Sequence, residues 1–245
     1  MKALEQFDLT GKTALVLALA VPAAWLERRL GRETNAGLDD LATVIFSSGS
    51  TGDPKGVMLS HYNVSSNVEQ LDQTFPLGPK ARLLGVLPFF HSFGFTGTLC
   101  LPGGLGAGGV YHPNPLEARA ICELVQQHEV AVLNATPTFL QLYLRGCPPE
   151  QFGSVQVVLV GAEKLPERVA QAFEEHFGIR LWEAYGCTEC APAVTVNTHD
   201  FRAAGFRQVG AKRGKIGHPL PGVSVRIVDP ETLQPRPIGQ PGLLL

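Results

Sequence analysis

The sequence predicts an α/β fold: a mainly parallel sheet flanked by helices, followed by the start of a β-rich subdomain at the carboxyl end. Short apolar runs rich in β-branched residues alternate with amphipathic stretches between residues 38 and 213, which implies repeated strand–helix–strand units. Residues 155–160 form a nearly continuous apolar run, as parallel strands buried on both faces do. From Gly214 onward the sequence changes to Pro- and Gly-rich turns around one alternating run at 223–228, which predicts a separate, half-buried β element.

The individual elements follow from the same patterns. A β-branched run closed by a Ser/Gly cluster predicts a buried strand at 41–46. Ser60 is a typical N-cap for a helix that ends at about Thr74, before a proline and a glycine. The glycine-dense residues 103–109 predict a turn. The other expected strands are 82–87, 109–111, 130–133 and 179–184, and the other expected helices are 116–128, 137–145 and 167–177.

Composition excludes several classes of protein. The 245 residues carry 20 Lys+Arg against 22 Asp+Glu, a formal charge of −2, so binding nucleic acid through a basic surface is not the main function. A hydrophobic content of 44% with only 17% charged residues excludes wholesale disorder. We expect three segments: a partial leading segment and linker at 1–37, the α/β core at 38–213, and the truncated start of the β-rich subdomain at 214–245.

The amino-terminal segment contains an apolar run at 13–26 that is interrupted by Pro22. The run is shorter than the roughly 20 residues that a membrane-spanning helix needs. Glu5 and Asp8 stand where a signal peptide would carry positive charge. We interpret residues 1–37 as a buried strand or helix plus a linker, with a membrane-adjacent segment as the alternative.

The five cysteines are an odd and scattered set, which argues against a disulfide scaffold and favours a cytoplasmic protein. Cys187 and Cys190 form a lone CxxC pair. Since no second pair or His motif completes a tetrahedral metal site, we interpret them as small residues in a loop that exists for another reason.

Two loops carry groups suited to phosphate. Residues 47–56, SSGSTGDPKG, follow the first expected strand, and their small residues let backbone N–H groups approach an anion while Lys55 adds a cation. The loop lacks the Gly-Lys-Ser/Thr spacing of a Walker A motif. A second loop, YGCTE at 185–189, leaves another expected strand; its Thr188 hydroxyl can reach a phosphate oxygen, and the Glu189 carboxylate suits Mg²⁺. Ligands bind open α/β sheets at the carboxyl ends of parallel strands, so the two loops predict one shared crevice.

Four ordered motifs resemble the signatures of the AMP-binding, adenylate-forming enzymes: SSGSTGDPKGV at 47–57, GAEKLP at 161–166, YGCTE at 185–189 and GKIGHPLPGVSVRIVD at 214–229. The family includes acyl-CoA synthetases, acyl-acyl-carrier-protein synthetases, luciferases and peptide-synthetase adenylation domains. The resemblance implies a two-step reaction in which a carboxylate attacks the α-phosphate of ATP and the acyl-adenylate then passes its acyl group to a thiol.

The resemblance also implies roles for individual residues. Lys55 would lie near the departing pyrophosphate, Tyr185 and Gly186 against the nucleotide, and Thr188 at the α-phosphate, with Glu189 as the Mg²⁺ ligand. The β- and γ-phosphates of ATP would be held by Ser47, Ser48, Gly49, Ser50, Thr51 and Gly52. The adenine and acyl pockets would be lined by the backbone of Gly161, Ala162 and Glu163.

His91, in the segment PFFHSFG at 88–94, is our candidate for orienting the carboxylate substrate. The segment resembles the family's acyl-pocket lining, and a neutral His that donates to a carboxylate would orient it for in-line attack. The aromatic residues Phe89, Phe90, Phe93 and Phe95 suit either an acyl tunnel or core packing.

The motifs lead to a functional hypothesis. The chain resembles a central fragment of an ATP-dependent ligase that acts on a carboxylic acid, with CoA or an acyl carrier protein as the acceptor. No charged residue lies between Phe89 and Val110, which argues against an amino acid as the substrate. The resemblance to the long-chain acyl-CoA or acyl-acyl-carrier-protein synthetase branch implies a long-chain fatty acid, with aryl acids next. The ribose-binding Asp and the lysine-bearing domain of the family have no counterpart, so we expect little turnover from the fragment itself.

Alternatives remain open at this point. The chain could be a non-catalytic nucleotide-binding module, and the longer enzyme could associate with the inner face of a membrane. Basic residues gather around the start of the last motif and form either a solvated patch or a contact for a phosphate-bearing acceptor: Arg202, Arg207, Lys212, Arg213 and Lys215.

Overall fold

The computed structural model describes residues 37–48 and 53–245. It divides into two compact units, 1–40 and 41–245, and all the elements below belong to the second unit. Residues 49–52, which the sequence analysis assigns to phosphate binding, lie outside the described residues. None of the helices in the described ranges is both long and apolar enough to cross a bilayer.

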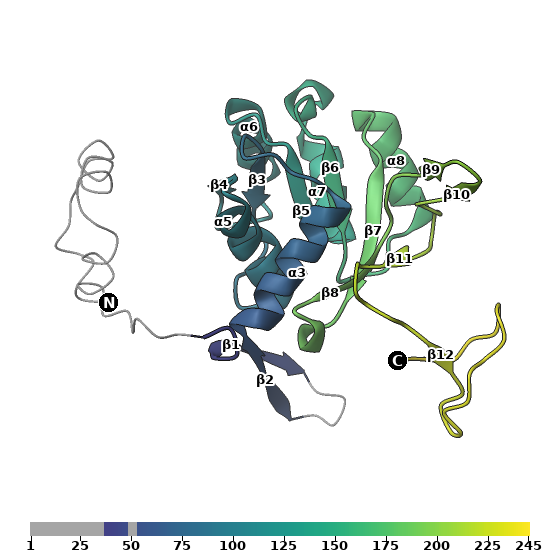
Figure 1. Cartoon of the computed structure of the whole chain (residues 1–245). Helices are drawn as coiled ribbons and strands as arrows, with labels where there is room; N and C mark the ends of the chain where they lie inside the picture. The colour runs from purple at the N-terminus through teal and green to yellow at the C-terminus, as the bar shows by residue number, and fades with distance from the viewer. Residues whose placement is uncertain (1–36, 49–52) are drawn as a thin grey trace. The chain divides into compact units, whose positions relative to one another are not determined.

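A seven-stranded sheet forms the centre of the second unit, in the order β11-β8-β7-β6-β5-β3-β4 (Figure 1). The five strands from β7 to β4 are parallel neighbours, and β8 and β11 extend the sheet antiparallel at one edge. The strands are β3 Arg82–Gly85, β4 Gly108–Tyr111, β5 Val132–Ala135, β6 Val157–Val160, β7 Leu181–Gly186, β8 Ala193–Val196 and β11 His218–Pro219. The mainly parallel sheet of the prediction is confirmed.

Helices cover both faces of this sheet. On one face, buried Ile121, Leu140 and Phe173 pack with strand residues such as Leu133 and Val158. On the other face, Val68, Leu71 and Leu101 pack against Leu83 and Trp182. The first layer consists of α6 Ala118–Gln127, α7 Pro137–Gly146 and α8 Glu167–Phe177, and the second of α3 His61–Thr74, the π-helix η1 Phe95–Cys100 and α5 Leu101–Leu105. The expected three-layer α/β arrangement is therefore present.

The helix α3 begins as its sequence predicts. The Ser60 hydroxyl accepts a hydrogen bond from the backbone N–H of Asn63, and the Asn63 side chain accepts one from the N–H of Ser60. This reciprocal cap satisfies two N–H groups that the helix itself cannot pair. The expected helices at 137–145 and 167–177 are also present, with Gly178 in the left-handed conformation after α8.

Two expected elements are wrong in detail. The strand at 41–46 is not a buried strand of the sheet: β1 Leu41–Ser48 pairs antiparallel with β2 Pro54–Ser60 in a separate hairpin, and Phe46 is 72% exposed. Only one face of this apolar strand is therefore buried. The turn expected at 103–109 is shorter: residues 103–105 belong to α5, Gly106 ends that helix with a φ of 66°, and β4 begins at Gly108.

The carboxyl-terminal residues form short strands. β9 Phe201–Ala203 pairs with β10 Phe206–Gln208, and β12 Ile227–Val228 pairs with β13 Leu243–Leu244. The alternating run at 223–228 thus contributes only its last two residues to a strand. The segment boundary expected at 213/214 stays a prediction; beyond it, β11 pairs with β8, and Leu220 is buried in the core beneath α3.

Asn67 joins α3 to the edge of the sheet. Its side-chain amide donates to the carbonyl of Ala193 at 2.8 Å and accepts from the N–H of Ala193 at 3.1 Å. The amide thereby pairs both backbone groups of the first residue of β8, as a neighbouring strand would. Asn67 is buried, so both bonds are made away from water, where unpaired polar groups are costly.

We expect Asn67→Leu to lower the free energy of unfolding by about 2–4 kcal/mol, because it leaves two backbone groups of Ala193 without partners. Urea denaturation followed by circular dichroism measures the change. Glu69→Ala, at an exposed position on the same helix, is the matched control and should change stability by less than about 0.5 kcal/mol. Equal stability of the Asn67 variant and the wild-type chain would contradict this role.

Candidate functional site

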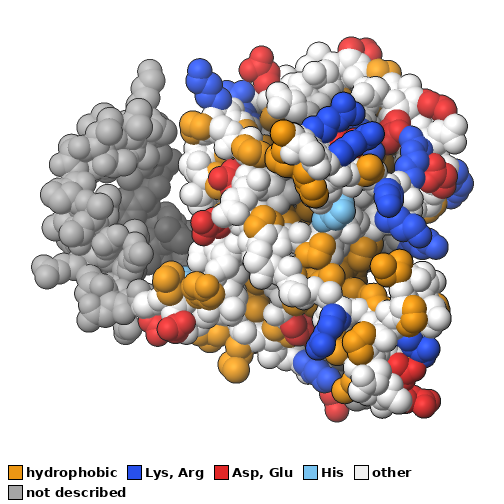
Figure 2. Space-filling view, turned by 45° about the vertical axis from the view of Figure 1, so that its right-hand side comes forward, with side chains coloured by type: hydrophobic (Ala, Val, Ile, Leu, Met, Phe, Trp, Pro, Cys, Tyr) orange, Lys and Arg blue, Asp and Glu red, His pale blue; other side chains and the backbone are white. Residues whose placement is uncertain are grey.

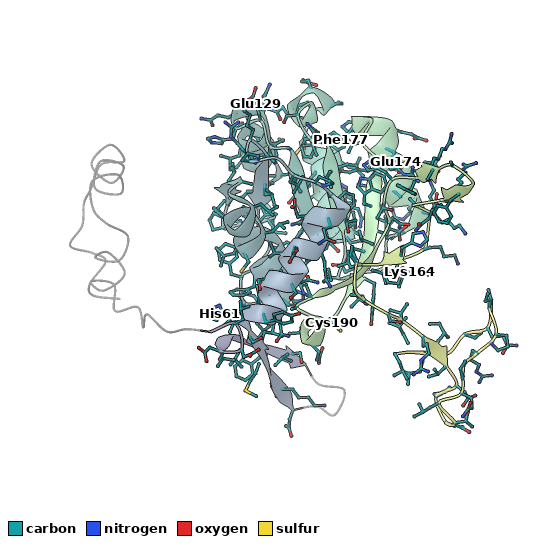
Figure 3. All side chains as sticks on the ribbon, in the orientation of Figure 1. His61, Glu129, Lys164, Glu174, Phe177 and Cys190 are labelled. Carbon is teal, nitrogen blue, oxygen red and sulfur yellow. The ribbon has the colours of Figure 1, made fainter. Side chains whose placement is uncertain are left out.

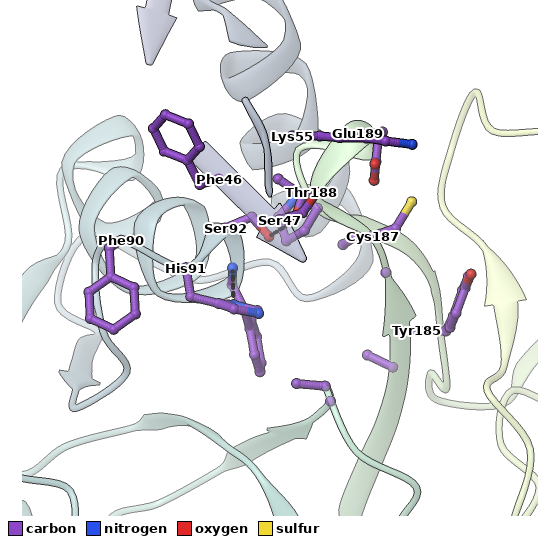
Figure 4. A pocket seen from close by; sticks show the side chains of 17 residues that line it. Phe46, Ser47, Lys55, Phe90, His91, Ser92, Tyr185, Cys187, Thr188 and Glu189 are labelled. Atoms are coloured by element: carbon purple, nitrogen blue, oxygen red, sulfur yellow. Dashed lines mark hydrogen bonds between the residues drawn. The ribbon is translucent and has the colours of Figure 1, made fainter. Parts of the chain in front are cut away.

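A cleft of about 600 Å³ opens at the carboxyl ends of the parallel strands. In Figure 3 the label of Cys190, which follows β7, marks this end of the sheet, and the labels of Glu129 and Phe177 mark the opposite end. Loops from distant parts of the sequence form the walls (Figure 4). The lining residues are Phe46, Ser47, Lys55, Phe90, His91, Ser92, Phe93, Gly161, Ala162, Ala184, Tyr185, Gly186, Cys187, Thr188, Glu189, Pro192 and Ala193.

The cleft brings together most of the residues that the sequence singles out. Of the described candidates, Ser47, Lys55, His91, Gly161, Ala162, Tyr185, Gly186, Thr188 and Glu189 all line it. Glu163 does not: it is exposed, and its carboxylate accepts a hydrogen bond from the Thr138 hydroxyl at 2.7 Å. Ser48 is the last residue of β1, beside Ser47. Gly49, Ser50, Thr51 and Gly52 lie outside the described residues.

The loop that carries Thr188 and Glu189 is a short 3₁₀ turn, η3 Thr188–Cys190, between β7 and β8. The N–H of Cys187 donates to the carbonyl of Pro192 at 3.0 Å, which closes the base of the loop. A Cβ at Gly186 would lie 2.3 Å from that same carbonyl oxygen. Only glycine therefore allows the two strands to approach here, and this approach fixes where the Thr188 hydroxyl and the Glu189 carboxylate stand.

Ser92 links this loop to the segment that carries His91. The Ser92 and Thr188 hydroxyl oxygens lie 3.4 Å apart, and Ser92 is buried. Ser92 is a site residue that the sequence analysis missed; its position directly after His91 was the available signal. The contact means that the turn after β7 and the segment after β3 share one polar junction in the cleft.

His91 is held by its own local structure. Its Nδ1 accepts a hydrogen bond from the N–H of Phe93 at 3.2 Å, as the N-cap of the short helix α4 Ser92–Gly94. A neutral ring that accepts at Nδ1 carries its proton on Nε2, so that nitrogen is a donor. A Cβ at Gly94 would lie 2.1 Å from the carbonyl oxygen of Pro88, which shows how tightly this segment turns.

The cleft combines groups of different charge and polarity. Lys55 is its cation and Glu189 its carboxylate, and Figure 4 shows both at the rim, away from Phe90 and His91. Burial raises the pKa of the Tyr185 phenol, and the neighbouring cysteines and Glu189 raise it further, so the ring stays neutral at physiological pH. Tyr185 therefore offers a flat aromatic surface and a hydroxyl rather than a charge.

Metal binding at this site would depend on the ligand as well as on the protein. Within residues 37–48 and 53–245, no group of three or more His, Cys, Asp or Glu side chains could hold an ion. Mg²⁺ is commonly bound by one or two carboxylates together with substrate phosphates. Glu189, in the same cleft as Thr188 and Lys55, fits a site in which one carboxylate and the phosphates of a substrate hold the ion together.

Comparisons with known proteins agree with this geometry. A family model described as AMP-binding enzyme matches residues 6–245. The chain belongs to the AMP-binding enzyme family. Residues of three of the motifs quoted above, at 47–57, 161–166 and 185–189, line the cleft.

Individual relatives are similar over most of the chain. A long-chain-fatty-acid–CoA ligase of Escherichia coli O157:H7 is 30% identical over 84% of this chain, which covers 36% of that ligase. A 4-coumarate–CoA ligase-like protein of Oryza sativa subsp. japonica is 32% identical, with 37% of its length covered. The crystal structure of ATP-bound MatB from Rhodopseudomonas palustris matches with a TM-score of 0.73 at 30% identity, over 85% of this chain and 39% of MatB. The chain thus spans little more than a third of these relatives.

Gly186→Ala should displace the η3 loop, since the added Cβ meets the Pro192 carbonyl. We expect the unfolding free energy to fall by about 1–3 kcal/mol, measured by urea denaturation. Gly153→Ala is the control, because Gly153 has a φ of −59° and its Cβ would meet only the carbonyl oxygen of Glu150, at 3.4 Å. A Gly186 variant as stable as that control would mean that the close approach is dispensable.

Proposed function

We propose that the chain is the nucleotide- and acyl-binding part of an ATP-dependent carboxylic acid ligase that works in the cytoplasm. The carboxylate oxygen attacks the α-phosphorus of ATP, the bond to the β-phosphate oxygen breaks, and acyl-AMP and pyrophosphate form. A thiol then attacks the acyl carbon, which gives a thioester and releases AMP. The convergence of Ser47, Lys55, Thr188 and Glu189 on one cleft is the observation that supports this reaction.

The cleft residues divide between the two ends of ATP. In our proposal Ser47, Ser48 and residues 49–52 hold the β- and γ-phosphates, Lys55 lies near the departing pyrophosphate, and the Thr188 hydroxyl donates to the α-phosphate. Tyr185 and the backbone at Gly161 and Ala162 contact the adenine, with Gly186 beside the nucleotide. Ala162 has a φ of 65°, a conformation that turns its peptide groups sharply at the end of β6 and supports a backbone contact there.

The negative charge of the phosphates explains why the reaction would need hydrogen-bond donors and cations in the cleft. Negative charge spreads over the phosphoryl oxygens during transfer, and fixed donors and cations offset it without having to reorganise. Glu189 would hold Mg²⁺ when the ion is bound, and the ion would supply positive charge that neutralises part of the phosphate charge. Lys55 would stabilise the pyrophosphate as it leaves.

His91 is proposed to orient the acid. Its Nε2–H, left free by the bond from Phe93 to Nδ1, would donate to one carboxylate oxygen and leave the other to attack. The neighbouring Phe90 and Phe93 also line the cleft and would contact the acyl chain. Because no charged residue lies between Phe89 and Val110, we propose a long-chain fatty acid as the substrate.

An aryl acid is the second candidate, supported by the similarity to a 4-coumarate–CoA ligase-like protein. The acceptor would be CoA or the pantetheine arm of an acyl carrier protein. The reaction test is exchange of labelled pyrophosphate into ATP, with laurate, palmitate, benzoate and 4-coumarate compared in a longer protein that contains this chain. Exchange with none of these acids would overturn the proposed reaction.

Nucleotide binding tests the cleft in the chain itself. We expect Mg·ATP or AMP to bind weakly, with a Kd in the millimolar range, and Thr188→Val to weaken binding by about tenfold because it removes a donor to phosphate. Isothermal titration calorimetry measures both. Thr188→Ser keeps the hydroxyl and should bind like wild type. Binding that is identical in all three proteins would remove Thr188 from the site.

The role of Glu189 separates it from the cysteines beside it. In a longer protein with full activity, Glu189→Gln should reduce acid-dependent pyrophosphate exchange by about 10²-fold or more, the scale of losing one strong electrostatic contact. A Cys187→Ala, Cys190→Ala variant should stay within a few-fold, because neither thiol offsets phosphoryl charge. Collapse of the cysteine variant with survival of the glutamate variant would reverse our assignment.

A further inference from the structure

The β9–β10 hairpin is exposed from Phe201 to Arg207, and one of its faces carries two aromatic side chains. All residues from Phe201 to Arg207 are exposed, and the side chains of Phe201 and Phe206 are 57% and 55% exposed. Their rings lie 6.2 Å apart on one face of the hairpin. The residues between β9 and β10 are Ala204 and Gly205, so the tip offers small and aromatic surface with no polar side chain.

The opposite face of the hairpin is basic. Arg202 and Arg207 are direct cross-strand partners, an arrangement in which like charges destabilise a β-ladder. Residues 200–215 contain five basic side chains and a single acid, Asp200, in a chain whose net charge is −2. Figure 2 shows Lys and Arg side chains interspersed with hydrophobic ones on the side of the molecule that this view brings forward.

Nearby acids neutralise only part of this charge. Asp200 pairs with Arg207 at 3.6 Å, and Arg213 is bonded to both Glu167 and Glu174 on α8. The side chains of Arg202, Lys212 and Lys215 contribute the remaining positive charge around the hairpin. We define the basic–aromatic patch as Phe201, Arg202, Phe206, Arg207, Lys212 and Lys215.

The patch is held in place by hydrogen bonds to the buried Asn197 and the exposed Asp200. Asn197 donates to the carbonyl of Lys215 at 2.6 Å and accepts from the N–H of Lys212 at 3.1 Å. The Asp200 carboxylate accepts from the N–H of Gly210 at 3.0 Å, which closes the base of the hairpin. A Cβ at Gly210 would lie 2.1 Å from the carbonyl oxygen of His199. The hairpin is therefore a preorganised projection from the end of β8.

We propose that this basic–aromatic patch docks the protein on an anionic lipid bilayer surface. The aromatic and small residues of the tip would enter the headgroup–acyl boundary, and the basic side chains would contact anionic headgroups, which is the pairing that peripheral membrane elements use. The charge of the hairpin favours an anionic bilayer, because residues 200–215 carry five basic side chains and one acid. The exposed aromatic side chains suit the apolar part of the same interface. The proposal does not depend on the ligase reaction.

The test is co-sedimentation of the full chain with vesicles of phosphatidylcholine alone or with 30% phosphatidylglycerol. We expect binding to the anionic vesicles only, weakening as salt rises because exposed charges are screened. Arg202→Gln with Lys212→Gln should lower the partition coefficient by about 25-fold, at roughly fivefold for each charge lost near the surface. Phe201→Ser with Phe206→Ser should lower it by at least about tenfold.

Matched control variants remove the same kinds of side chain at exposed positions outside the patch. Lys80→Gln with Arg119→Gln removes two exposed charges, and Met58→Ser with Leu116→Ser removes two exposed apolar side chains; both variants should bind like wild type. Urea denaturation checks that every variant is folded. Equal effects of the control and patch substitutions would overturn the assignment to the hairpin.

The remaining outcomes separate this inference from the proposed reaction. Failure of the wild-type chain to bind anionic vesicles would overturn the inference, and capture of poly-glutamate instead would point to an acidic protein partner. Either result leaves pyrophosphate exchange with a soluble acid unaffected. Loss of exchange with retained vesicle binding would overturn the ligase and leave the membrane contact standing.

Discussion

The pairing of the Asn67 amide with both backbone groups of Ala193 is the contact on which the site depends most. The sheet is parallel up to β7 and then reverses at β8, where the register between the two strands shifts at Tyr185/Gly186, next to the pairing of Gly186 with Ala193. The side chain of Asn67, from α3, bonds to Ala193 at this point. Since Ala193 lines the cleft and follows the Thr188–Glu189 turn, the same contact helps to position the side chains that we propose for phosphate.

Local backbone constraints complete the cleft. Gly186 and Gly94 each stand where a Cβ would meet a carbonyl oxygen, one beside η3 and the other behind His91. The hydroxyls of Ser92 and Thr188 then meet at the junction of the two segments. The phosphoryl transfer that we propose would need fixed rather than mobile donors, and close approaches of the backbone restrict the two segments that carry them.

The cleft and the basic–aromatic patch lie at different places in the fold. The cleft lies at the carboxyl ends of the parallel strands, where Figure 3 places Cys190, whereas the β9–β10 hairpin follows the other end of β8. A fatty acid ligase would take its substrate from a lipid phase, so a membrane contact away from the reacting groups is compatible with the proposed reaction. Neither proposal requires the other.

The sequence by itself determined the layers of the fold, because burial on both faces of a parallel strand leaves a continuous apolar run and a covering helix shows its own period. It also determined most of the cleft, since Lys55, His91, Thr188 and Glu189 belong to motifs that keep their local order. Tertiary structure alone decided that β1 pairs with β2 outside the seven-stranded sheet, because an apolar run does not specify which strand it pairs with. It alone showed the pairing of Asn67 with Ala193 and the contact of Ser92 with Thr188, since each joins residues about a hundred positions apart. Polar contacts between distant residues leave no period in the sequence, and only folding brings their atoms together.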